Sequence, residues 1–578
     1  MPLWLGQEVQ EVPRGRAVAR TAGILLSLGL PGLTARAQSN TDARAVSSDS
    51  LAILRHAQDA VRGFERAREA DAPASTGRTY CDVRIGRYCV RYPVPGDDPP
   101  KEPPRVDQAR ADLIEVLSAA ARGLPGDDWI AGQRVRYLVE HGRLSAAVAA
   151  ARDCRGSRWW CASLEGFALH GAEDDAAADS AFAQALVAMT GERRCEWIDL
   201  TSVLGDDGGA YSGVPCRARD GANLRIWWLA RPLFSRAGND IRAEHYSRHV
   251  MATILAETAA GRVVDPPGDL AEATVRYGWP VYWVRAPAAS DGESSGLIGG
   301  RRTPTWSFFA SNASPPKWTL DRERPPALYA PTWAKRFATI PDAQIARFRR
   351  ADSVVTIAGF DVGVDSALGR QIPRVRVAVG TDAASPVAVG PPVAATHGGV
   401  AVLSADPPAV VSVEAIHEAS GWVGRLRTAT ADPTAWVTSR LSDLLLVSAD
   451  AVRSGVLSSL TQVALPGATF PAGRPVGIYW EWYEHPAKGT VTTIEVRVAR
   501  LGGKAAPSPL GRSECVPPEK AAMALQWREE AGDHPALGRS IALDLTRLEA
   551  GRYLMAASMQ AGQEAPRCTS REILLLGS

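Results

Sequence analysis

The spacing of apolar residues along this chain changes from a helical period to a strand period. Between residues 47 and 189 apolar side chains recur every three or four positions, which predicts amphipathic helices. A first helix is expected from one such stripe, formed by Leu51, Leu54, Ala57, Val61 and Phe64. A second is expected over about Val106–Arg122. Residues 79–92, between them, alternate around Gly86 and predict a hairpin.

Two helix pairs are expected between Trp129 and Met189. Asp127 or Asp128 can cap the first helix, and Gly142 can end it. Small residues and one aromatic then follow in the same order as in a repeat: Ala146, Ala147, Gly166, Ala178, Phe182 and Ala185. This order resembles the tetratricopeptide repeat, although Ala147 and Ala178 are 31 residues apart and the family repeats every 34 or so. A plain helical bundle with the same packing is the alternative.

The central segment is expected to start with a loop, at residues 201–220, followed by a helix and a strand. Asn239 is a good N-cap for a helix that ends near Gly261. Alternation at Thr274–Tyr277 predicts a strand, and Gly278-Trp279-Pro280 would then turn the chain.

A family resemblance rests on this segment. Trp227 and Pro232 precede the capped helix, and the further matching positions are Asn239, Arg242, Glu244, Tyr246, Arg248, Arg276, Tyr277, Gly278 and Pro280. The pattern over about residues 225–345 resembles the GWxTD domain of exported bacterial proteins, as in Gemmatimonadota and Acidobacteria. The name-giving tetrapeptide is absent from residues 261–267, where it would fall. The resemblance implies an architecture and no reaction.

From Val354 onward, short runs of period two alternate with Gly, Pro, Asp and Ser turns, which predicts antiparallel Ig-like sandwiches. The sequence therefore predicts a multidomain α + β chain. Its expected parts are a signal peptide at 1–37, a TPR-like helical region at 38–200, a GWxTD-like α+β unit at 201–345, and β-sandwiches at 346–435 and 436–578.

Charge adds little to this picture. The 578 residues carry 65 Lys+Arg and 63 Asp+Glu, a formal net charge of +2. Such a small excess gives no reason to expect a nucleic-acid or polybasic membrane partner. With 46% hydrophobic and 22% charged residues, the composition is that of a globular protein.

Residues 14–37 have the layout of a secretory signal. Arg14, Arg16 and Arg20 precede a short apolar core, and Ala35-Arg36-Ala37 offers a small-x-small cleavage site. No later apolar stretch is long enough for a transmembrane segment. We therefore expect an exported protein, periplasmic or extracellular.

The eight cysteines support this location, because an even number in an exported chain indicates disulfides. Short spacing favours pairing of Cys81 with Cys89, Cys154 with Cys161 and Cys195 with Cys216, and sequential pairing then leaves the more distant Cys515 and Cys568 for each other. A zinc site is the other interpretation, but the chain has no C-x2-C pair and no His at ligand spacing from these cysteines.

No catalytic set and no cofactor motif can be assigned. His245 and His249 are spaced to share a metal ion on a helix, but Tyr246 stands where a zinc protease has its Glu. A partly exposed helix face that packs on the neighbouring sheet is therefore favoured over a metal site. Trp480 and Trp482 share one strand face, which is either core or an aromatic binding face for sugars or a partner.

The leading hypothesis is a non-catalytic protein that binds another protein through its helical region or acts as a scaffold. A hydrolase of the envelope or of secreted polymers is an alternative, with Glu244, Asp265 and Glu272 as its first candidate acids. A carbohydrate-binding surface protein, built on the C-terminal strands, is the other.

Overall fold

The computed structural model describes residues 36–577, apart from 75–82, 86–87, 91–100, 205–210, 260–266, 286–296, 301–330, 332, 364, 431–435, 437–438, 455–456, 485, 504 and 533–536. Most of the expected signal peptide, at residues 1–35, and Cys81 therefore lie outside the described residues. The chain divides into two compact units, Met1–Ile53 and Leu54–Ser578. The first unit contributes only the N-terminal part of the first helix, up to Ile53, to the described structure, and all other helices and strands belong to the second unit.

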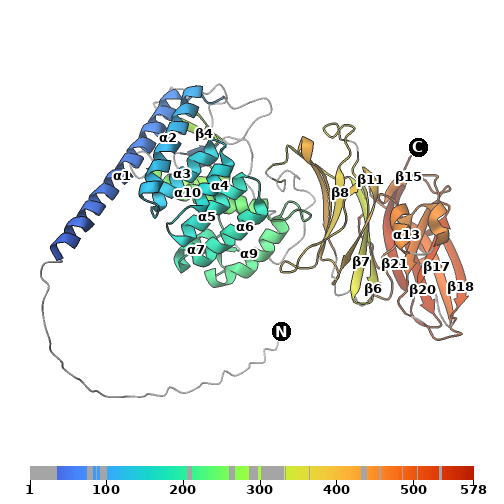
Figure 1. Ribbon diagram of the computed structural model, residues 1–578. Coiled ribbons are helices and arrows are strands. Elements are labelled where there is room, and N and C mark those ends of the chain that lie inside the picture. Colours follow the sequence, from blue (N-terminus) through green and yellow to red (C-terminus); the bar gives the residue numbers. More distant parts are fainter. Residues whose placement is uncertain are drawn as a thin grey trace, which may run out of the picture. The chain divides into compact units, whose positions relative to one another are not determined.

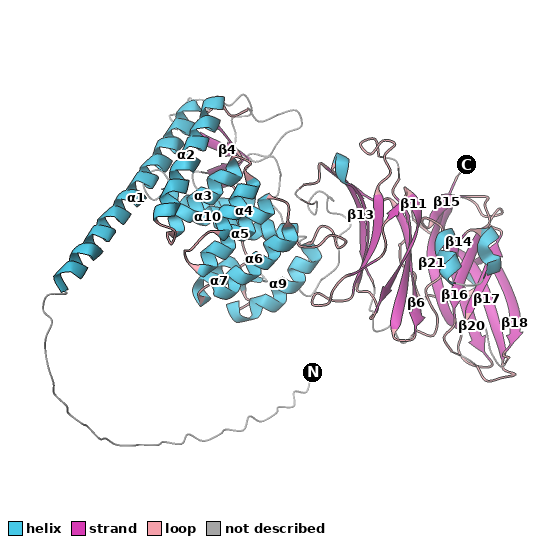
Figure 2. Ribbon diagram, viewed as in Figure 1, coloured by secondary structure: helices cyan, strands magenta, loops and turns pink. Residues whose placement is uncertain are grey.

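The N-terminal half of the chain is helical (Figures 1 and 2). Its helices are α1 (Arg36–Asp71), α2 (Pro104–Gly123), α3 (Asp128–Glu140), α4 (Leu144–Arg152), α5 (Arg158–Gly171), α6 (Asp175–Ala188), α7 (Gly191–Trp197), α9 (Cys216–Ala230), α10 (Asp240–Ala259) and α11 (Pro267–Tyr277). Two short hairpins accompany them: β1 (Val83–Ile85) with β2 (Tyr88–Val90), and β3 (Tyr282–Arg285) with β4 (Leu297–Gly300). The hairpin predicted at 79–92 is thus present in its described part.

The helices begin and end where their residues dictate. The Asp127 carboxylate accepts a hydrogen bond from the Ile130 N–H at 2.8 Å and caps α3. Gly142, just after α3, has a φ of +74°, a conformation that favours glycine. Helices α5 and α6 approach closely at Gly166, where an added Cβ would lie 2.9 Å from the ring of Phe182. The small residues expected in the helix pairs therefore have a packing role.

One predicted strand is wrong. Thr274–Tyr277 is not extended but forms the last turn of α11. Three successive residues of α11, Ala273, Thr274 and Val275, are buried, which the alternation of a half-buried strand would not allow. The helix ends at Gly278, whose φ is +85° and whose N–H donates to the Thr274 carbonyl. Four alternating residues are too few to distinguish a strand from a helix turn that is covered by neighbours.

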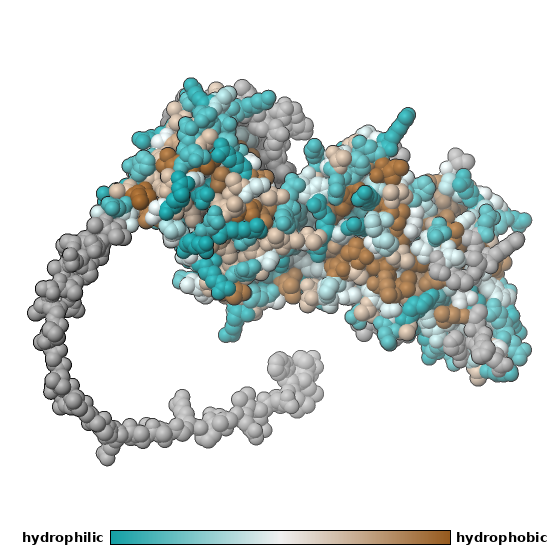
Figure 3. Space-filling model, in the orientation of Figure 1, coloured by the Kyte–Doolittle hydropathy of each residue, from teal (hydrophilic) through white to brown (hydrophobic). Residues whose placement is uncertain are grey.

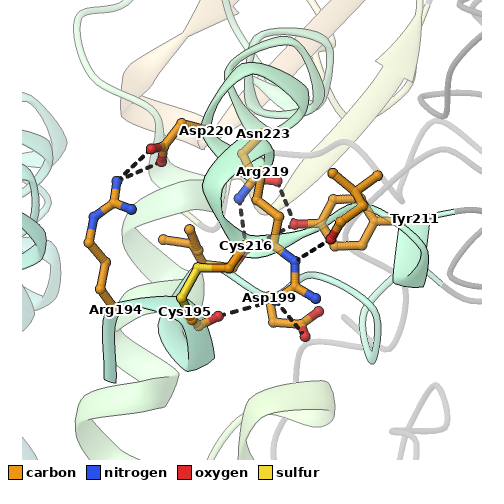
Figure 4. The surroundings of a disulfide bond; sticks show 10 residues. Arg194, Cys195, Asp199, Tyr211, Cys216, Arg219, Asp220 and Asn223 are labelled. Atoms are coloured by element: carbon orange, nitrogen blue, oxygen red, sulfur yellow. Dashed lines mark hydrogen bonds and ion pairs between the residues drawn. A yellow bond between two sulfur atoms is a disulfide. The ribbon is translucent and has the colours of Figure 1, made fainter. Parts of the chain in front are cut away.

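Three disulfides join the cysteines in the predicted sequential order: Cys154–Cys161, Cys195–Cys216 and Cys515–Cys568. Figure 4 shows the second, which links α7 to the start of α9. Beside it the Arg194 guanidinium binds the Asp220 carboxylate at 2.7 Å, and Arg219 donates to the Cys195 carbonyl. The disulfide thus lies inside a set of polar contacts that join the same two helices.

The first β part consists of two sheets packed around a common core. One sheet has the order β10-β8-β12-β13-β5, with β9 beside β8, and the other β11-β7-β6. The strands are β5 (Arg336–Thr339), β6 (Asp342–Arg350), β7 (Ser353–Asp361), β8 (Arg374–Gly380), β9 (Ala388–Val389), β10 (Val393–Ala394), β11 (His397–Ser404), β12 (Val410–His417) and β13 (Trp422–Ala429). Phe360, Val377, Val413 and Trp422 belong to the core between the sheets.

The second β part has the same two-layer plan, with sheet orders β14-β16-β19 and β15-β21-β20-β17-β18. Its strands are β14 (Leu445–Val447), β15 (Thr469–Pro471), β16 (Val476–Glu481), β17 (Val491–Leu501), β18 (Ala521–Glu530), β19 (Gly538–Leu543), β20 (Gly551–Ala561) and β21 (Arg567–Leu576). Short helical turns connect them: η5 (Ala449–Ser454), α13 (Leu457–Leu460), η6 (Thr461–Val463) and η7 (Pro518–Lys520); η4 (Glu418–Ser420) lies in the first β part.

The sequence had led us to expect purely antiparallel sheets, but each of the two β parts contains one parallel pair of strands. The short edge strands β5 and β15 pair parallel, with β13 and β21 respectively. Each lies far from its partner in sequence, so no tight hairpin turn joins them and antiparallel pairing is not imposed. The chain is nevertheless a multidomain α+β protein, as predicted. Among the residues that the structure describes, none of the helices combines the length and apolar character needed to cross a membrane.

We predict that Gly166→Ala lowers the free energy of unfolding by about 1–3 kcal/mol, because the new methyl group would overlap the buried Phe182 ring. The matched control is Gly63→Ala in α1, where nothing lies within 4 Å of the new Cβ. That change is expected to stabilise the helix by about 0.5–1 kcal/mol. Urea unfolding of both variants measures the difference, and equal stabilities would contradict the close approach of α5 and α6.

Candidate functional site

Helix α10 is the most polar buried element of the helical region. It carries Glu244, His245, Arg248 and His249, and all four are buried. The helix packs against α3, α5, α6, α9 and α11, so it lies among the other helices and has no broad solvent face. Buried polar groups cost free energy unless they find partners, so the contacts of α10 decide what this region can do.

Glu244 is the centre of a cluster of charges. One of its carboxylate oxygens accepts from the Arg248 guanidinium at 2.9 Å, and the other lies 3.0 Å from His170 Nε2 on α5. The second ring nitrogen, His170 Nδ1, lies 2.9 Å from the Asp175 carboxylate at the start of α6. With His170 protonated, the two cations balance the two carboxylates, so the cluster is neutral and joins three helices.

The pKa of His170 follows from these contacts. Burial alone would lower it, but the hydrogen bonds to Asp175 and Glu244 outweigh burial and raise the pKa to about 9. His170 is therefore an imidazolium at neutral pH, with both ring nitrogens donating to carboxylates. A general base needs a free lone pair, so His170 cannot act as one in this arrangement.

The Arg248 side chain also caps the C-terminal end of α11. Its Nη1 donates to the carbonyl of Arg276 at 2.8 Å and to that of Val275 at 3.3 Å, in the last turn of α11. These carbonyls carry the negative end of the helix dipole and have no partner further along α11. A guanidinium with five donors can satisfy them and Glu244 together.

The two histidines of α10 are neutral and enclosed. Their ring centroids are 4.8 Å apart, His249 stacks on Trp197, and His245 Nε2 lies 3.3 Å from the Trp197 carbonyl. Burial lowers the pKa of His249 to about 4 and the pKa of His245 well below its ordinary value. No group of three or more His, Cys, Asp or Glu within the described part of the chain could hold a metal ion. The sequence had predicted a partly exposed face packed on a sheet, but both histidines are buried and α10 packs against other helices.

The residues of the family-like pattern lie mostly in this region. Asn239 caps α10 by accepting from the Arg242 N–H, and its own amide donates to the Trp227 carbonyl on α9. Arg242 binds Asp179 on α6 at 2.9 Å. Tyr246 packs among the rings of Trp197, Trp227 and Phe182.

The remaining family-like residues lie at the end of α11. Arg276 binds Glu272 at 3.0 Å on the surface and covers the ring of Tyr277. Gly278 ends the helix, and Pro280 follows before β3. The pattern therefore specifies the packing of α9, α10 and α11, and its residues do not converge on an open cleft.

Helix α10 also covers the face that helix pairs of the repeat type would offer to a partner. Its Ile254 carbonyl accepts from Gln133 on α3, Glu244 binds His170 on α5, and Arg242 binds Asp179 on α6. One face of α3 and α5 is thus covered by another helix of the chain itself.

Trp480 and Trp482 need a correction as an aromatic binding face. Their side chains are 0% and 6% exposed and belong to the core of the second β part. The Trp480 indole N–H donates to the Met559 sulfur. Of the two interpretations that the sequence left open, core is the one the structure supports.

The candidate hydrolase acids are not arranged as a pair. Glu244 has both oxygens engaged, Glu272 lies at the surface beside Arg276, and Asp265 lies outside the described residues. Sequence reasoning missed His170 as a partner of Glu244, and Asp175 as the second partner of His170. No spacing signal could have found them, since 74 residues separate His170 from Glu244.

The exposed apolar side chains suggest no single site either. Most large ones belong to the β parts, among them Ile372, Val389, Leu403, Val491 and Leu525, and Figure 3 shows hydrophobic residues in separate groups on the visible face.

Comparisons with known proteins add no family. No family model matches the chain, and none of the curated proteins matches it. Among solved structures, the crystal structure of red sea bream transglutaminase matches with 11% identity, a TM-score of 0.13, and coverage of 55% of this chain and 44% of that chain. The chain thus spans less than half of that protein. A TM-score this low carries no argument about fold or activity.

We predict that Glu244→Gln lowers the free energy of unfolding by about 3 kcal/mol or more, because it leaves Arg248 and His170 buried without their common counter-charge. In the wild type, the stabilisation from the raised pKa of His170 is complete below about pH 6.5 and is lost as the pH rises through about 9. The variant should lose most of this dependence. Urea unfolding at pH 6, 7.5 and 9.5 measures both effects.

The matched control for this variant is Glu272→Gln, which breaks an exposed ion pair with Arg276 at the same i,i+4 spacing. It should change the free energy of unfolding by less than about 1 kcal/mol. Equal losses in the two variants would contradict the central place of Glu244.

We predict that His249→Phe reduces the loss of stability at acid pH. The pKa of His249 is lowered to about 4 in the folded protein. Between pH 6.5 and 4 its side chain is therefore protonated in the unfolded chain but neutral in the folded one. The free energy of unfolding therefore falls as the pH drops from about 6.5 to 4. A Phe ring at position 249 binds no proton, so it removes this contribution of His249 to the fall while it keeps the stack on Trp197. Thermal unfolding from pH 7 to 4 measures the slope. An unchanged slope would show that His249 titrates normally.

Proposed function

We propose that this chain is an exported, non-catalytic protein that binds another protein or acts as a scaffold. In this proposal α3–α6 are TPR-like repeats, α9–α11 belong to a GWxTD-like unit, and the two β parts are Ig-like sandwiches. The three disulfides and the lack of a membrane-crossing helix among the described residues are compatible with export.

The observation that carries the proposal is the way the helical region is joined to the first β part. The Glu414 carboxylate, on β12 and 0% exposed, accepts from the backbone N–H groups of Phe234 and Ser235 at 2.8 Å each. Glu414 is also paired with Arg427 of β13. A buried carboxylate with two N–H donors and a guanidinium is stable only while all of them are in place.

Arg427 adds to the same joint by binding backbone carbonyls of the helical region, whereas Glu414 binds its N–H groups. Its guanidinium donates to the carbonyls of Arg231 and Pro232, after α9, and lies 3.9 Å from the centre of the Phe234 ring. Leu229, Phe234, Ala378 and Val410 form the apolar contact beside it. A buried polar joint of this kind holds the modules at one spacing, which a scaffold needs and a flexible linker would not provide.

A comparable joint connects the two β parts. The buried Arg571 guanidinium donates to the carbonyls of Ile345, Leu444 and Pro509 at 2.6, 2.7 and 2.8 Å. Arg347 on β6 binds Asp443 at 2.7 Å, and both side chains are buried. Buried charged groups therefore join the two β parts as well.

Neither alternative has a specific observation in its favour. The carbohydrate-binding alternative relied on Trp480 and Trp482, which are core residues. The hydrolase alternative relied on acids that do not converge. Within the helical region, a partner would contact the sides of α4 and α6 rather than the covered face of α3 and α5, and Val187 on α6 is 84% exposed there.

The proposal is tested by affinity capture from the envelope and secreted fractions of the source cells. The wild-type chain should enrich a defined partner in a saturable way, whereas Glu414→Gln, which loosens the joint, should reduce the recovery at least fivefold. The matched control, Glu418→Gln in η4, changes an exposed carboxylate of the same β part and should leave capture unchanged.

Circular dichroism must first show that both variants are folded. Failure to enrich any partner, or saturable turnover of a peptide or glycan panel by the wild-type chain, would refute a non-catalytic scaffold.

A further inference from the structure

The joint between the helical region and the first β part carries more positive charge than its acidic residues balance. Four arginines donate to backbone carbonyls of residues 231–236, one from within this loop and three from the sheet on which it lies: Arg231, Arg376, Arg425 and Arg427. Within electrostatic reach of Arg231 lie a fifth arginine and three acids: Arg242, Glu414, Asp179 and Asp240. Five guanidiniums thus face three carboxylates, and these described residues leave an excess of two positive charges.

Glu414 cannot balance the sheet arginines by itself. It lies on β12 between Arg376 of β8 and Arg425 of β13, each directly opposite it in the register. Its two oxygens already accept from two backbone N–H groups of the loop, and Arg427 shares one of them at 3.4 Å. The carbonyls that the arginines bind are uncharged, so they satisfy hydrogen bonds without cancelling charge.

Arg231 is a partly buried cation whose surroundings do not replace its lost hydration. Its Nη2 donates to the Arg236 carbonyl, but its Nε is buried and has no hydrogen-bond partner in the described part of the chain. Burial lowers the pKa of Arg231, although Glu414, Asp179 and Asp240 act in the opposite direction. A cation in this position is stabilised by an anion that reaches it.

Ser235 supplies a second, independent sign of a ligand. It is 8% exposed, and its Oγ is buried without a hydrogen-bond partner among the described residues. The backbone around it is fixed, since its N–H donates to Glu414 and its carbonyl accepts from Arg376 at 3.2 Å. The Arg231 guanidinium binds the next carbonyl, that of Arg236. A buried hydroxyl donor thus lies where two guanidiniums bind the loop, and buried polar groups of native proteins rarely lack a partner.

We propose that this point of the loop binds a small tetrahedral oxyanion with two negative charges, inorganic phosphate or an ion of the same chemistry. Ser235 Oγ and Arg231 Nε are its donors, and Arg376 approaches it from β8. The two charges of the ion balance the local excess, and guanidiniums hold such oxygens through charge-assisted hydrogen bonds. The bound ion joins the loop after α9 to the sheet of the first β part. The joint is therefore more stable with phosphate than without it.

Titration calorimetry and thermal unfolding of the full chain test the site with inorganic phosphate, at an ionic strength held constant with sodium chloride. We expect one ion per chain, a dissociation constant of about 1 mM or lower, and a saturable rise in the unfolding temperature. Glycerol 3-phosphate should bind at least about tenfold more weakly, because its organic group must also fit beside the buried Ser235. No saturable heat up to about 10 mM phosphate, or tighter binding of the ester, would overturn the proposal.

Ser235→Ala separates binding from folding. The hydroxyl has no partner among the described residues, so its removal should leave the unfolding temperature without phosphate unchanged. The affinity for phosphate should fall about tenfold or more, because a hydrogen bond to a charged group is lost. The matched control is Ser247→Ala on α10, which removes another buried hydroxyl without a described partner and should leave phosphate binding unchanged. Equal affinities of the two variants would contradict the role of Ser235.

The charges are tested by a second pair of variants. Arg231→Gln should abolish the phosphate-dependent rise in the unfolding temperature. Arg374→Gln, which replaces an exposed arginine two residues before Arg376 on β8, should leave that rise unchanged. Equal losses in both variants would indicate general attraction of anions to the surface and would overturn a specific site. The result is independent of the capture experiment, since phosphate binding does not rest on the proposed protein partner.

Discussion

A charge that leaves water must be balanced where it lies, and this constraint shapes each part of the structure. Glu244 is balanced by Arg248 and His170, which belong to the same helix and to α5. Glu414 is balanced by Arg427 and by two backbone N–H groups after α9. Removing one partner from such a group leaves a penalty of several kcal/mol. The helical region and its joint to the first β part are therefore stable only with all of these groups assembled.

The same constraint explains why the charged residues of α10 bind groups on neighbouring helices. Each charged group there uses its hydrogen-bonding capacity on a neighbouring helix: His170 on two carboxylates, Arg248 on Glu244 and the end of α11. Both ring nitrogens of His170 and both carboxylate oxygens of Glu244 are engaged in this arrangement. What the arrangement does provide is a helix that covers α3 and α5 and transmits their packing to α9 and α11.

Much of the local structure could be predicted from the sequence because short-range signals determine it. The caps at Asp127 and Asn239 and the disulfides Cys154–Cys161 and Cys195–Cys216 follow from residues close in sequence, and Cys515–Cys568 follows from the order of the cysteines along the chain. The errors occur where neighbours in space outweigh local pattern. Thr274–Tyr277 alternates like a strand but ends a helix. Strand β18, rich in residues that favour helices, went unpredicted and is extended because β17 supplies its hydrogen bonds.

By itself, the sequence determined the change from a helical to a strand-rich half, the α+β fold class and three of the cysteine pairs, because these depend on periodicity and on order along the chain. The tertiary structure alone decided which charges meet, as with His170 and Glu244 or Glu414 and the backbone of Phe234. It also decided that β16 is buried on both faces, which places Trp480 in the core and Glu481 against Arg350. Such contacts join residues that lie tens to hundreds of positions apart, and no local pattern records which distant surface a side chain will meet.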